Sequence, residues 1–325
     1  MLSTKYRVLK TPSSYNTPLG ICKTVNGSDL DVDIFIAEMG ARRKNDIKKL
    51  CKTVRPSMGI ITGITDQHGE TLGGIEGIKR AKNQLIDGLI GEKTAIFSSD
   101  TKESEELFKK ANCKKYLVGI KGKRFVYAKN IKQEKHGIYF TLVISGKEYQ
   151  TFSPLLGEHN ISNICLAVCA SKILGVEDEK ILSVIPRLSP PPHRAQILQT
   201  DEGVTVIDDG YNANIVGLRS TAKAVQSFDG EKIAVTPGIV ELGKNSKEIN
   251  FEVGKILGET FDEVIAVGKN ADDILSGYSA VKRKDNAYKN FGRKVNTREK
   301  AQEILATKNL KGKVVVFFND LPDRY

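Results

Sequence analysis

The alternation of strand-like and helix-like segments along this chain of 325 residues predicts an α/β protein with two domains. Short β-rich runs are separated by helical patterns, which is typical of a mostly parallel sheet with helices on both faces. Three consecutive prolines, within RLSPPPHR at 187–194, interrupt the alternation, and they cannot continue a helix. We therefore expect a central sheet domain in residues 1–188 and a smaller, Rossmann-like α/β domain in residues 189–325.

The first domain opens with strands and helices in turn. The expected strands are RVLKT, DIFIAEM, MGIITGI and TAIFSS, at 7–11, 33–39, 58–64 and 94–99. The expected helices lie near 45–53, 73–90 and 103–112. Short strands separated by turns come next and should form an antiparallel annex: YLVGI, RFVYA, GIYFTLVI and KEYQTF, between 116 and 152. A helix is expected at 159–176, with Gly175 as its C-cap.

The second domain resumes the alternation. Its expected strands are VTVIDD, KIAVTPG, EVIAVG and VVVFF, at 204–209, 232–238, 263–268 and 314–318. Helices are expected from about 216, near 247–257 and at 270–277. This order again favours a parallel sheet.

Composition narrows the class of protein. With 40% hydrophobic and 27% charged residues, the chain has an ordinary globular composition. No apolar run approaches the roughly 20 residues that a membrane span needs, and MLSTKYRVLK lacks the apolar core of a signal peptide. The five cysteines match no paired metal spacing, so Cys165 and Cys169 are interpreted as small buried apolar residues. We expect a cytoplasmic protein with no membrane partner.

The formal net charge of +11 indicates an anionic partner. Nucleic acid and a polyphosphate substrate are both candidates. The basic residues are scattered, with only short clusters such as Lys109–Lys110 and Lys282–Lys284, and the sequence shows no known nucleic-acid motif. The pattern therefore favours a small polyphosphate ligand over nucleic acid.

One lysine of the expected helix 73–90 faces the wrong way. The apolar stripe of this helix is made by Ile75, Ile78, Leu85, Ile86 and Leu89. Lys79 and Arg80 point away from the stripe, as solvated charges should, whereas Lys82 lies on it. Lys82 could be a snorkelling residue whose stem covers apolar surface. Alternatively it is partly buried, in which case desolvation lowers the pKa of its amine and makes the amine reactive.

Polar residues follow several expected strands, where ligands bind in open α/β sheets. Glu38 and His68 come after neighbouring strands, so they could share a crevice and bind Mg²⁺ or Mn²⁺. A surface carboxylate and a structural histidine are the plainer explanations. In VTVIDDGYNAN, Asp209 could hold a ribose hydroxyl. Asn214 could instead cap the helix that follows.

Two amides lie on one face of the helix expected at 159–176. Asn160 and Asn163 are three residues apart and therefore face the same way. Each amide offers a donor and an acceptor, which matches the edge of a purine. Helix capping by Asn160 is the alternative explanation.

These groups, in this order, resemble those of the Mur ligase family, enzymes that use ATP to make peptide bonds in the bacterial cell-wall precursor. DDGYNAN at 208–214 is similar to the DD-x-YNANP stretch of the MurF type, which joins D-Ala-D-Ala to a UDP-muramyl-tripeptide. Other similar segments are TPSSYNTPLG, AEMGA, HGETLGGIEGIKRAK, EHNISN, PPHR and PGIVELGKNS. The resemblance covers nearly the whole chain.

The resemblance implies an ATP-dependent amide ligase that works through an acyl phosphate, with ATP and Mg²⁺ as cofactors. It implies that Glu38, His68 and Lys82, the last as a carbamate, hold the metal. The implied nucleotide contacts are Asn160 and Asn163 at the adenine, Arg194 at the phosphates and Asp209 at the ribose. The implied substrate contacts are Asn16, Thr17, Tyr211, Asn212 and Asn214. The partners would be a UDP-muramyl-peptide and a D-Ala-D-Ala-type dipeptide.

The sequence also departs from the family pattern. Ile215 replaces a usual proline, Asn250 lies near a common histidine, and Gln84 stands where an acidic residue often follows the lysine. No G-x-x-x-x-G-K-[ST] phosphate loop (P-loop) occurs in the sequence. We therefore expect residues 1–188 to be an ATPase-type domain without its P-loop strand and helix, in a chain truncated at its N-terminus.

Little turnover is expected from this chain alone, unless a partner segment supplies the loop. Two other functions stay open. One is a catalytically inactive Mur-ligase-like subunit, which the missing loop favours. The other is a related amide ligase that acts on a different substrate.

Overall fold

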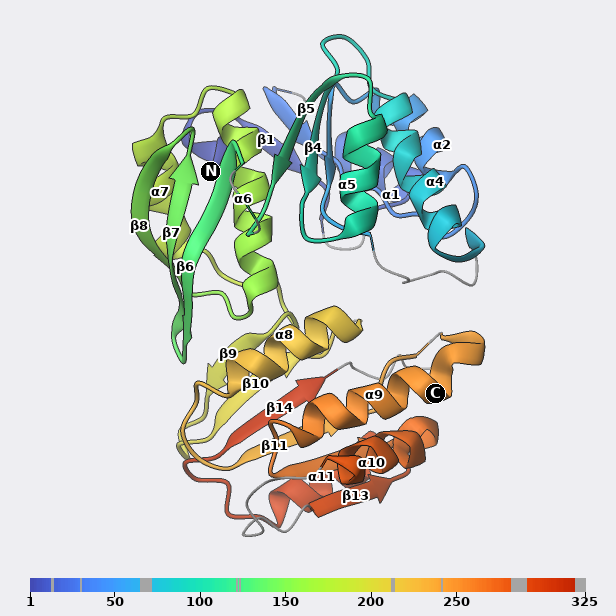
Figure 1. The fold of residues 1–325 in the computed structure, drawn as a ribbon, viewed down its shortest axis with the longest axis vertical. Coiled ribbons are helices and arrows are strands. Elements are labelled where there is room, and N and C mark those ends of the chain that lie inside the picture. Colours follow the sequence, from blue (N-terminus) through green and yellow to red (C-terminus); the bar gives the residue numbers. More distant parts are fainter. Residues whose placement is uncertain are drawn as a thin grey trace. The chain divides into compact units, whose positions relative to one another are not determined.

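The computed structural model describes residues 1–12, 15–29, 31–64, 72–120, 122, 124–211, 214–240, 242–281 and 291–318. The fold is α/β, as the sequence predicts (Figure 1). The chain divides into two compact units. The first comprises Met1–Ile131, Phe140–Phe152 and Asn160–Arg187, and the second comprises Lys132–Tyr139, Ser153–His159 and Leu188–Tyr325. Within the described ranges, no helix is both long enough and apolar enough to span a bilayer.

The strands of the first unit begin with two parallel groups. One is the pair β1 (Val8–Lys10) and β2 (Ile34–Ile36), and the other is the three-stranded sheet β3 (Met58–Ile61), β4 (Thr94–Ser98) and β5 (Lys114–Val118). The assignment of YLVGI to the antiparallel annex was wrong, because β5 pairs in parallel with β4. The cause is the helix at 102–110, which supplies the crossover that a parallel strand pair requires.

Helices cover one side of the β3–β4–β5 sheet. The helices of this region are α1 (Pro18–Asn26), α2 (Asp46–Val54), α4 (Gly74–Asp87) and α5 (Lys102–Lys110). Figure 1 shows α2, α4 and α5 on the same side of the strands. Helix α1 was not expected, although its signals stand in the sequence: Thr17 is the N-cap, its Oγ1 accepts the N–H of Gly20 at 3.2 Å, and Pro18 takes the first helical position.

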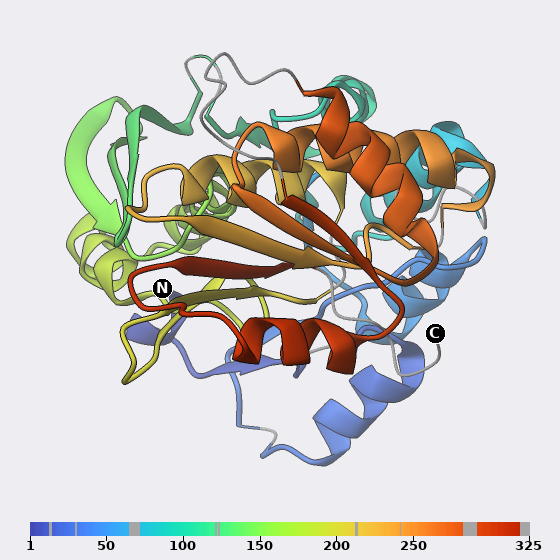
Figure 2. The ribbon, with the colours of Figure 1, turned by 90° about the horizontal axis from the view of Figure 1, so that it is seen from below.

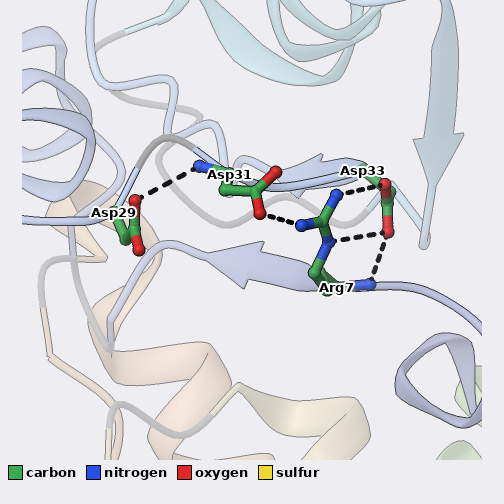
Figure 3. A network of polar contacts seen from close by, with 4 residues as sticks. All are labelled: Arg7, Asp29, Asp31 and Asp33. Carbon is green, nitrogen blue, oxygen red and sulfur yellow. Dashed lines mark hydrogen bonds and ion pairs between the residues drawn. The ribbon is translucent and has the colours of Figure 1, made fainter.

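An arginine ties β1 to the segment before β2 (Figure 3). The backbone N–H of Arg7 donates to Asp33 at 2.8 Å, and its guanidinium donates to Asp33 at 3.2 Å and also to Asp31. The Asp31 N–H in turn donates to Asp29 at 3.5 Å. The hydrogen bonds from Arg7 hold the pKa of Asp33 below its ordinary value. These contacts stand beside the first register pair of the two strands, Val8 and Ile34.

Three further strands and two helices complete the elements that precede the proline run. The strands β6 (Val126–Glu134), β7 (Gly137–Ile144) and β8 (Lys147–Ser153) form one sheet in sequence order. Their two-residue connections require antiparallel neighbours, as predicted for these segments. The helices are α6 (Glu158–Ile173) and α7 (Asp178–Val184).

Helix α6 ends in the cap that the sequence predicts. Gly175 has φ of 74° and donates its N–H to the carbonyl of Lys172 at 3.0 Å, while Val176 donates to Ser171 at 2.9 Å. This pair of bonds is the Schellman arrangement, in which a left-handed glycine satisfies the last carbonyl groups of the helix. Cys165 and Cys169 on α6 are fully buried, which confirms them as small core residues.

The second unit contains an open sheet with the strand order β13-β12-β11-β14-β10-β9. The strands are β9 (Gln196–Gln199), β10 (Thr205–Asp209), β11 (Lys232–Thr236), β12 (Glu263–Val267), β13 (Phe291–Val295) and β14 (Val314–Phe318). All neighbours are parallel except β9 and β10. The sequence did not predict β9 or β13, which carry few apolar residues in alternation.

Helices cover both faces of this sheet (Figure 2). They are α8 (Ile215–Val225), α9 (Ser246–Gly258) and α10 (Ala271–Ala280) on one face and α11 (Arg298–Ala306) on the other. Strand β14 shows why, since Val314, Val316 and Phe318 join the core below α8 to α10 and Val315 joins the core below α11. Apolar side chains on both sides of a strand require a helix layer on each face.

Candidate functional site

Glu38 lies just after β2 and is held beside the start of α1. Asn16 donates its side-chain amide to Glu38 Oε1 at 3.2 Å, and the Glu38 N–H donates to Thr11 Oγ1 at 3.0 Å. The carbonyl of Asn16 accepts the N–H of Gly40 at 3.0 Å. A Cβ at Gly40 would come within 3.0 to 3.2 Å of the Asn16 amide, so glycine permits this approach. The carboxylate of Glu38 itself remains exposed.

Lys82 lies on α4 and is half-buried, close enough to Glu38 for the two charges to interact. Burial lowers the pKa of the Lys82 amine from its ordinary value, because it disfavours the charged form, and the carboxylate of Glu38 acts in the opposite direction. The lowered pKa shows that burial is the larger of the two effects. The structure thus brings together two of the three predicted metal-site residues.

The prediction that Lys79 is a solvated charge was wrong. Lys79 is only 8% exposed, and its Nζ lies 2.5 Å from Glu106 Oε2 and 2.7 Å from Glu76 Oε1. Lys79 donates hydrogen bonds to both carboxylates, and these bonds, the one to Glu106 first, raise the pKa of Lys79 to about 12. Arg80 next to it is exposed, as expected. The helical pattern misplaced Lys79 because its partner Glu106 lies on another helix, α5.

His68 lies outside the described residues, within the segment 65–71. Its predicted pairing with Glu38 therefore stays a prediction. Over the described residues, no three His, Cys, Asp or Glu side chains gather closely enough to hold a metal ion. Glu38 nevertheless offers an exposed carboxylate beside an amine with a lowered pKa, and oxygen donors of this kind suit Mg²⁺.

The predicted amides of α6 lie in its first two turns. Asn160 is half-buried and Asn163 is exposed. Because α6 begins at Glu158, Asn160 lies inside the helix and does not cap it. The preceding His159 was not singled out by the sequence analysis. Its Nδ1 lies 3.0 Å from Ser220 Oγ on α8, and burial, followed by the charge of Arg194, lowers its pKa.

A second cluster lies at the carboxyl end of β10. Asp209 is half-buried, its Oδ1 accepts the N–H of Ala195 at 3.1 Å, and its Oδ2 accepts the hydroxyl of Thr221 at 2.9 Å. Burial raises the pKa of Asp209, and these two hydrogen bonds oppose the rise. The neighbouring Asp208 contacts His193 Nδ1 through Oδ2 at 2.7 Å. Both carboxylates therefore bind the segment that follows the prolines.

The predicted residues Arg194 and Tyr211 stack on each other. The guanidinium carbon of Arg194 lies 4.3 Å from the centroid of the Tyr211 ring, at cation–π distance. The Tyr211 N–H donates to the carbonyl of His193 at 3.0 Å. Both side chains are exposed to solvent, so the stack leaves them accessible to a ligand.

The other predicted substrate residues of this loop have different outcomes. Asn212 lies outside the described residues. Asn214 caps α8, where its Oδ1 accepts the N–H of Gly217 at 2.9 Å, which confirms the capping alternative. Ile215 takes the first helical position, where a proline is also well accommodated, and packs against the core of the unit.

Asn250, the other departure noted in the sequence, is fully buried on α9. Its Oδ1 accepts the N–H of Ile239 at 2.9 Å, and its Nδ2 donates to the carbonyl groups of Ile239 and Ser246 at 3.1 and 3.0 Å. A Cβ at Gly238, whose φ is 79°, would come within 2.1 Å of Asn250 Oδ1. Asn250 therefore fixes the loop after β11.

The two clusters offer different chemistry. The first presents a carboxylate and an amine whose pKa is lowered, which suits cation binding and reaction with a carbonyl electrophile. The second presents a guanidinium stacked on an aromatic ring, together with two carboxylates that contact the same turn, which suits an anion and hydroxyl groups. Each cluster belongs to its own compact unit.

Two family models match the chain. The model of the Mur ligase middle domain matches residues 1–171, and the model of the Mur ligase glutamate ligase domain matches residues 193–319. UDP-N-acetylmuramoyl-tripeptide–D-alanyl-D-alanine ligase of Bacillus subtilis (strain 168) is 30% identical over 281 residues, which cover 85% of this chain and 60% of that protein. The Escherichia coli (strain K12) ligase of the same name is 25% identical over 278 residues, which cover 84% and 61%.

Solved structures agree with these matches. A crystal structure of MurF from Acinetobacter baumannii superposes with a TM-score of 0.85 at 25% identity, covering 98% of this chain and 69% of that chain. MurF ligase from Thermotoga maritima in complex with ADP gives a TM-score of 0.83 at 25% identity, covering 98% and 71%. The chain spans about three fifths of the length of the two curated relatives.

Proposed function

Since the chain belongs to the Mur ligase family, we propose that it acts in ATP-dependent amide ligation, joining D-Ala-D-Ala to a UDP-muramyl-tripeptide in peptidoglycan synthesis. The observation that carries this proposal is the match of both domains to ligases of that name, at up to 30% identity. The similarity of DDGYNAN at 208–214 to the MurF-type stretch supports the assignment of these two substrates. A cytoplasmic location is part of the proposal, and the free cysteines support it.

The proposed domain division follows the proline run. Residues 1–188 would form the ATPase-type domain and residues 189–325 the C-terminal ligase domain. Two observations support this division. The first family model ends at 171 and the second begins at 193, and the last change between the compact units falls between Arg187 and Leu188. Residues 132–139 and 153–159 group with the second unit and differ from the proposed division.

The proposed reaction has two steps. The carboxylate of the muramyl peptide attacks the γ-phosphorus of ATP, which gives an acyl phosphate and releases ADP. The amine of the dipeptide then attacks the acyl carbon and loses a proton, and inorganic phosphate leaves as the amide forms. Such phosphoryl transfer depends mainly on positioning and charge neutralisation. When bound, Mg²⁺ would neutralise phosphate charge.

We propose that Glu38, His68 and Lys82 hold that metal. The pKa of the Lys82 amine is lowered by burial, so a larger share of the amine is uncharged and able to add CO₂. Addition with loss of a proton gives a carbamate, which converts a cation into an anionic oxygen ligand. The proximity of Glu38 and the exposure of its carboxylate support this arrangement.

The proposed nucleotide contacts are four residues predicted from the sequence. Asn160 and Asn163 would bind the adenine, Arg194 the phosphates and Asp209 the ribose. The accessible position of Arg194 supports its role. Asp209 already accepts two hydrogen bonds, but a carboxylate has about four acceptor sites, so a ribose hydroxyl can still donate to it.

The proposed substrate contacts are Asn16, Thr17, Tyr211, Asn212 and Asn214. Asn16 is only half-buried and lies beside Glu38. Tyr211 is 40% exposed and stacks with Arg194. Thr17 and Asn214 each use one side-chain oxygen to cap a helix, which fixes their positions beside the two clusters.

We also propose that a segment with a phosphate-binding loop adds to the strands of the first unit. The described strands β1–β2 and β3–β4–β5 form separate sheets. Ile36 on β2 is 45% exposed and Ile60 on β3 is 37% exposed. Apolar residues of parallel sheets are ordinarily covered on both faces, so added structure here would bury them.

A ligation assay tests the proposal. The purified chain is incubated with ATP, Mg²⁺, UDP-muramyl-tripeptide and D-Ala-D-Ala, with and without the part of the Bacillus relative that this chain does not cover, and ADP and the amide product are measured. Product in either arm supports the ligase. Product only with a different amine would indicate a related ligase. No product in either arm and no ATP binding would favour an inactive Mur-ligase-like subunit.

Variants of α4 connect the assay to the site. Lys82→Ala should reduce ligation by at least about 100-fold, because it removes a metal ligand. Bicarbonate together with a short carboxylate should restore part of the activity. Arg80→Ala is the matched control, since its side chain is exposed on the same helix. Equal activity of Lys82→Ala and the parent chain would contradict the role of Lys82.

A further inference from the structure

The turn after the proline run contains two residues in an unusual backbone conformation. His193 has φ of 60° and Ala195 has φ of 49°, and both values fall in the left-handed region. Residues with a Cβ pay conformational energy there, and the cost is highest for residues without a local stabilising contact. Two such residues on either side of Arg194 persist only if surrounding contacts hold them.

Three hydrogen bonds from the end of β10 hold this turn. His193 Nδ1 lies 2.7 Å from Asp208 Oδ2, and the carbonyl of His193 accepts the N–H of Tyr211 at 3.0 Å. The N–H of Ala195 donates to Asp209 Oδ1 at 3.1 Å. The turn is therefore fixed at both of its left-handed residues, through the imidazole and carbonyl of His193 and the backbone N–H of Ala195.

Arg194 lies between these fixed points. Its own N–H donates to the carbonyl of Pro191 at 3.2 Å, and its guanidinium lies over the Tyr211 ring. A change of φ at His193 would redirect the Cα–Cβ bond of the next residue. The imidazole–carboxylate contact between His193 and Asp208 is one of the contacts that hold the backbone from which the Arg194 side chain extends, and the His193 side chain is 59% exposed.

We propose that His193 is a positioning residue, which closes on Asp208 to hold the left-handed turn and so directs Arg194 toward its anionic ligand. This inference rests on the proposed role of Arg194 in binding the phosphates of ATP. The same contact keeps Arg194 against Tyr211 when no ligand is bound. A guanidinium that is already oriented loses less conformational entropy on binding.

Amide hydrogen exchange tests the turn without any activity. His193→Gly removes the imidazole but tolerates the left-handed backbone, and Asp208→Asn removes the carboxylate charge. Each variant should speed the exchange of the Tyr211 N–H by about threefold to tenfold, and the double variant should add little, because both act on one contact. Glu252→Gln is the control, since it breaks the exposed ion pair with Arg219 at 3.0 Å on the same unit.

Nucleotide binding tests the consequence for Arg194. The probe is MgADP, and its binding to the whole chain is measured by calorimetry in the presence of the part of the Bacillus relative that this chain does not cover. His193→Gly should weaken MgADP binding by about threefold to tenfold, and should have no further effect in an Arg194→Ala background. A purely structural role of His193 would instead shift the melting temperature and leave the two substitutions additive.

The outcomes separate this inference from the proposed function. Unchanged exchange of Tyr211 in His193→Gly and Asp208→Asn, or additive effects of His193→Gly and Arg194→Ala on binding, would overturn it. Absence of MgADP binding by the parent chain would contradict the role of Arg194 in nucleotide binding and, with it, the direction proposed for the guanidinium. Faster exchange in the variants would support the closure on Asp208 in either case.

Discussion

Lys79 and Lys82 lie one turn apart on α4, and burial has opposite consequences for them. Lys79 is buried but meets two carboxylates, which raise its pKa to about 12. Lys82 is half-buried with only a more distant influence from Glu38, and its pKa is lowered. The comparison shows that the exposed area of a lysine does not by itself set the direction of its pKa shift. Carboxylates that accept hydrogen bonds from the amine raise the pKa of Lys79, whereas burial without such partners lowers the pKa of Lys82.

Carbamate formation should show the largest difference between the two lysines. The pKa of Lys79 is about 12 and that of Lys82 is below the ordinary 10.5, so at about pH 8 the neutral fraction of Lys82 is more than about 30-fold higher. Carbon-13-labelled bicarbonate should therefore give a carbamate signal by NMR that Lys82→Met abolishes and Lys79→Met leaves. A carbamate signal that persists in Lys82→Met would contradict the prediction that the carbamate forms on Lys82.

Thermal stability should show the next largest effect. Lys79→Ala removes the cation that pairs with Glu76 and Glu106 and also the buried stem, so the melting temperature should fall by several degrees. Lys79→Met keeps most of the apolar stem, so its melting temperature should fall less. Calorimetry of both variants measures this. Melting temperatures equal to that of the parent would mean that the two ion pairs contribute nothing.

Substitution of Lys82 should stabilise the fold, whereas substitution of Lys79 should destabilise it. Lys82→Met should raise the free energy of unfolding at about pH 7, because burial in the parent disfavours the charged form of the Lys82 amine. The advantage should shrink as pH rises from the lowered pKa of folded Lys82 toward about 10.4, the value in the unfolded chain, since the folded amine loses its proton first. Urea unfolding in CO₂-free buffer at both ends of this range checks it; a constant difference would contradict the lowered pKa.

Substitution of Gln84 should have the smallest effect on the free energy of unfolding. Its Oε1 accepts the N–H of Lys48 at 3.1 Å and its Nε2 donates to Asn45 Oδ1 at 2.9 Å, so it ties α4 to the start of α2. Gln84→Glu keeps the first bond, and rotation of the Asn45 amide can restore the second. The free energy of unfolding should change by less than about 1 kcal/mol. A larger loss in urea unfolding would show that the neutral amide is required there.

The sequence predicted those features that depend on neighbours along the chain. The Gly175 cap follows from a glycine near the end of the helical pattern, and the burial of Cys165 and Cys169 follows from their place in an apolar helix. The structure confirms both. The pairing of Lys79 with Glu106 and the parallel pairing of β5 with β4 depend on contacts between separate elements. The helical pattern around Lys79 does not contain its partner, which lies on another helix. The helix expected near 103–112 did indicate a crossover before β5, so the second prediction failed because YLVGI was grouped with the short strands that follow it.

The candidate site, too, could be predicted only in part from the sequence. Residue types at strand ends pointed to Glu38 and Asp209, but their partners could not be predicted. The amide of Asn16 and the backbone N–H of Ala195 reach these carboxylates only because α1 and the turn after the prolines pack there. Neither left-handed residue of that turn is a glycine, which would be the usual sequence signal for such a conformation.

Gly238 and Asn250 illustrate how a packed loop limits evolutionary change. The space that a Cβ at 238 would need is occupied by the amide oxygen of residue 250, and that same oxygen satisfies the N–H of Ile239. Neither position can accept a larger or apolar replacement without disturbing the other. Across related sequences we expect the two positions to covary, so that a change at one accompanies a change at the other.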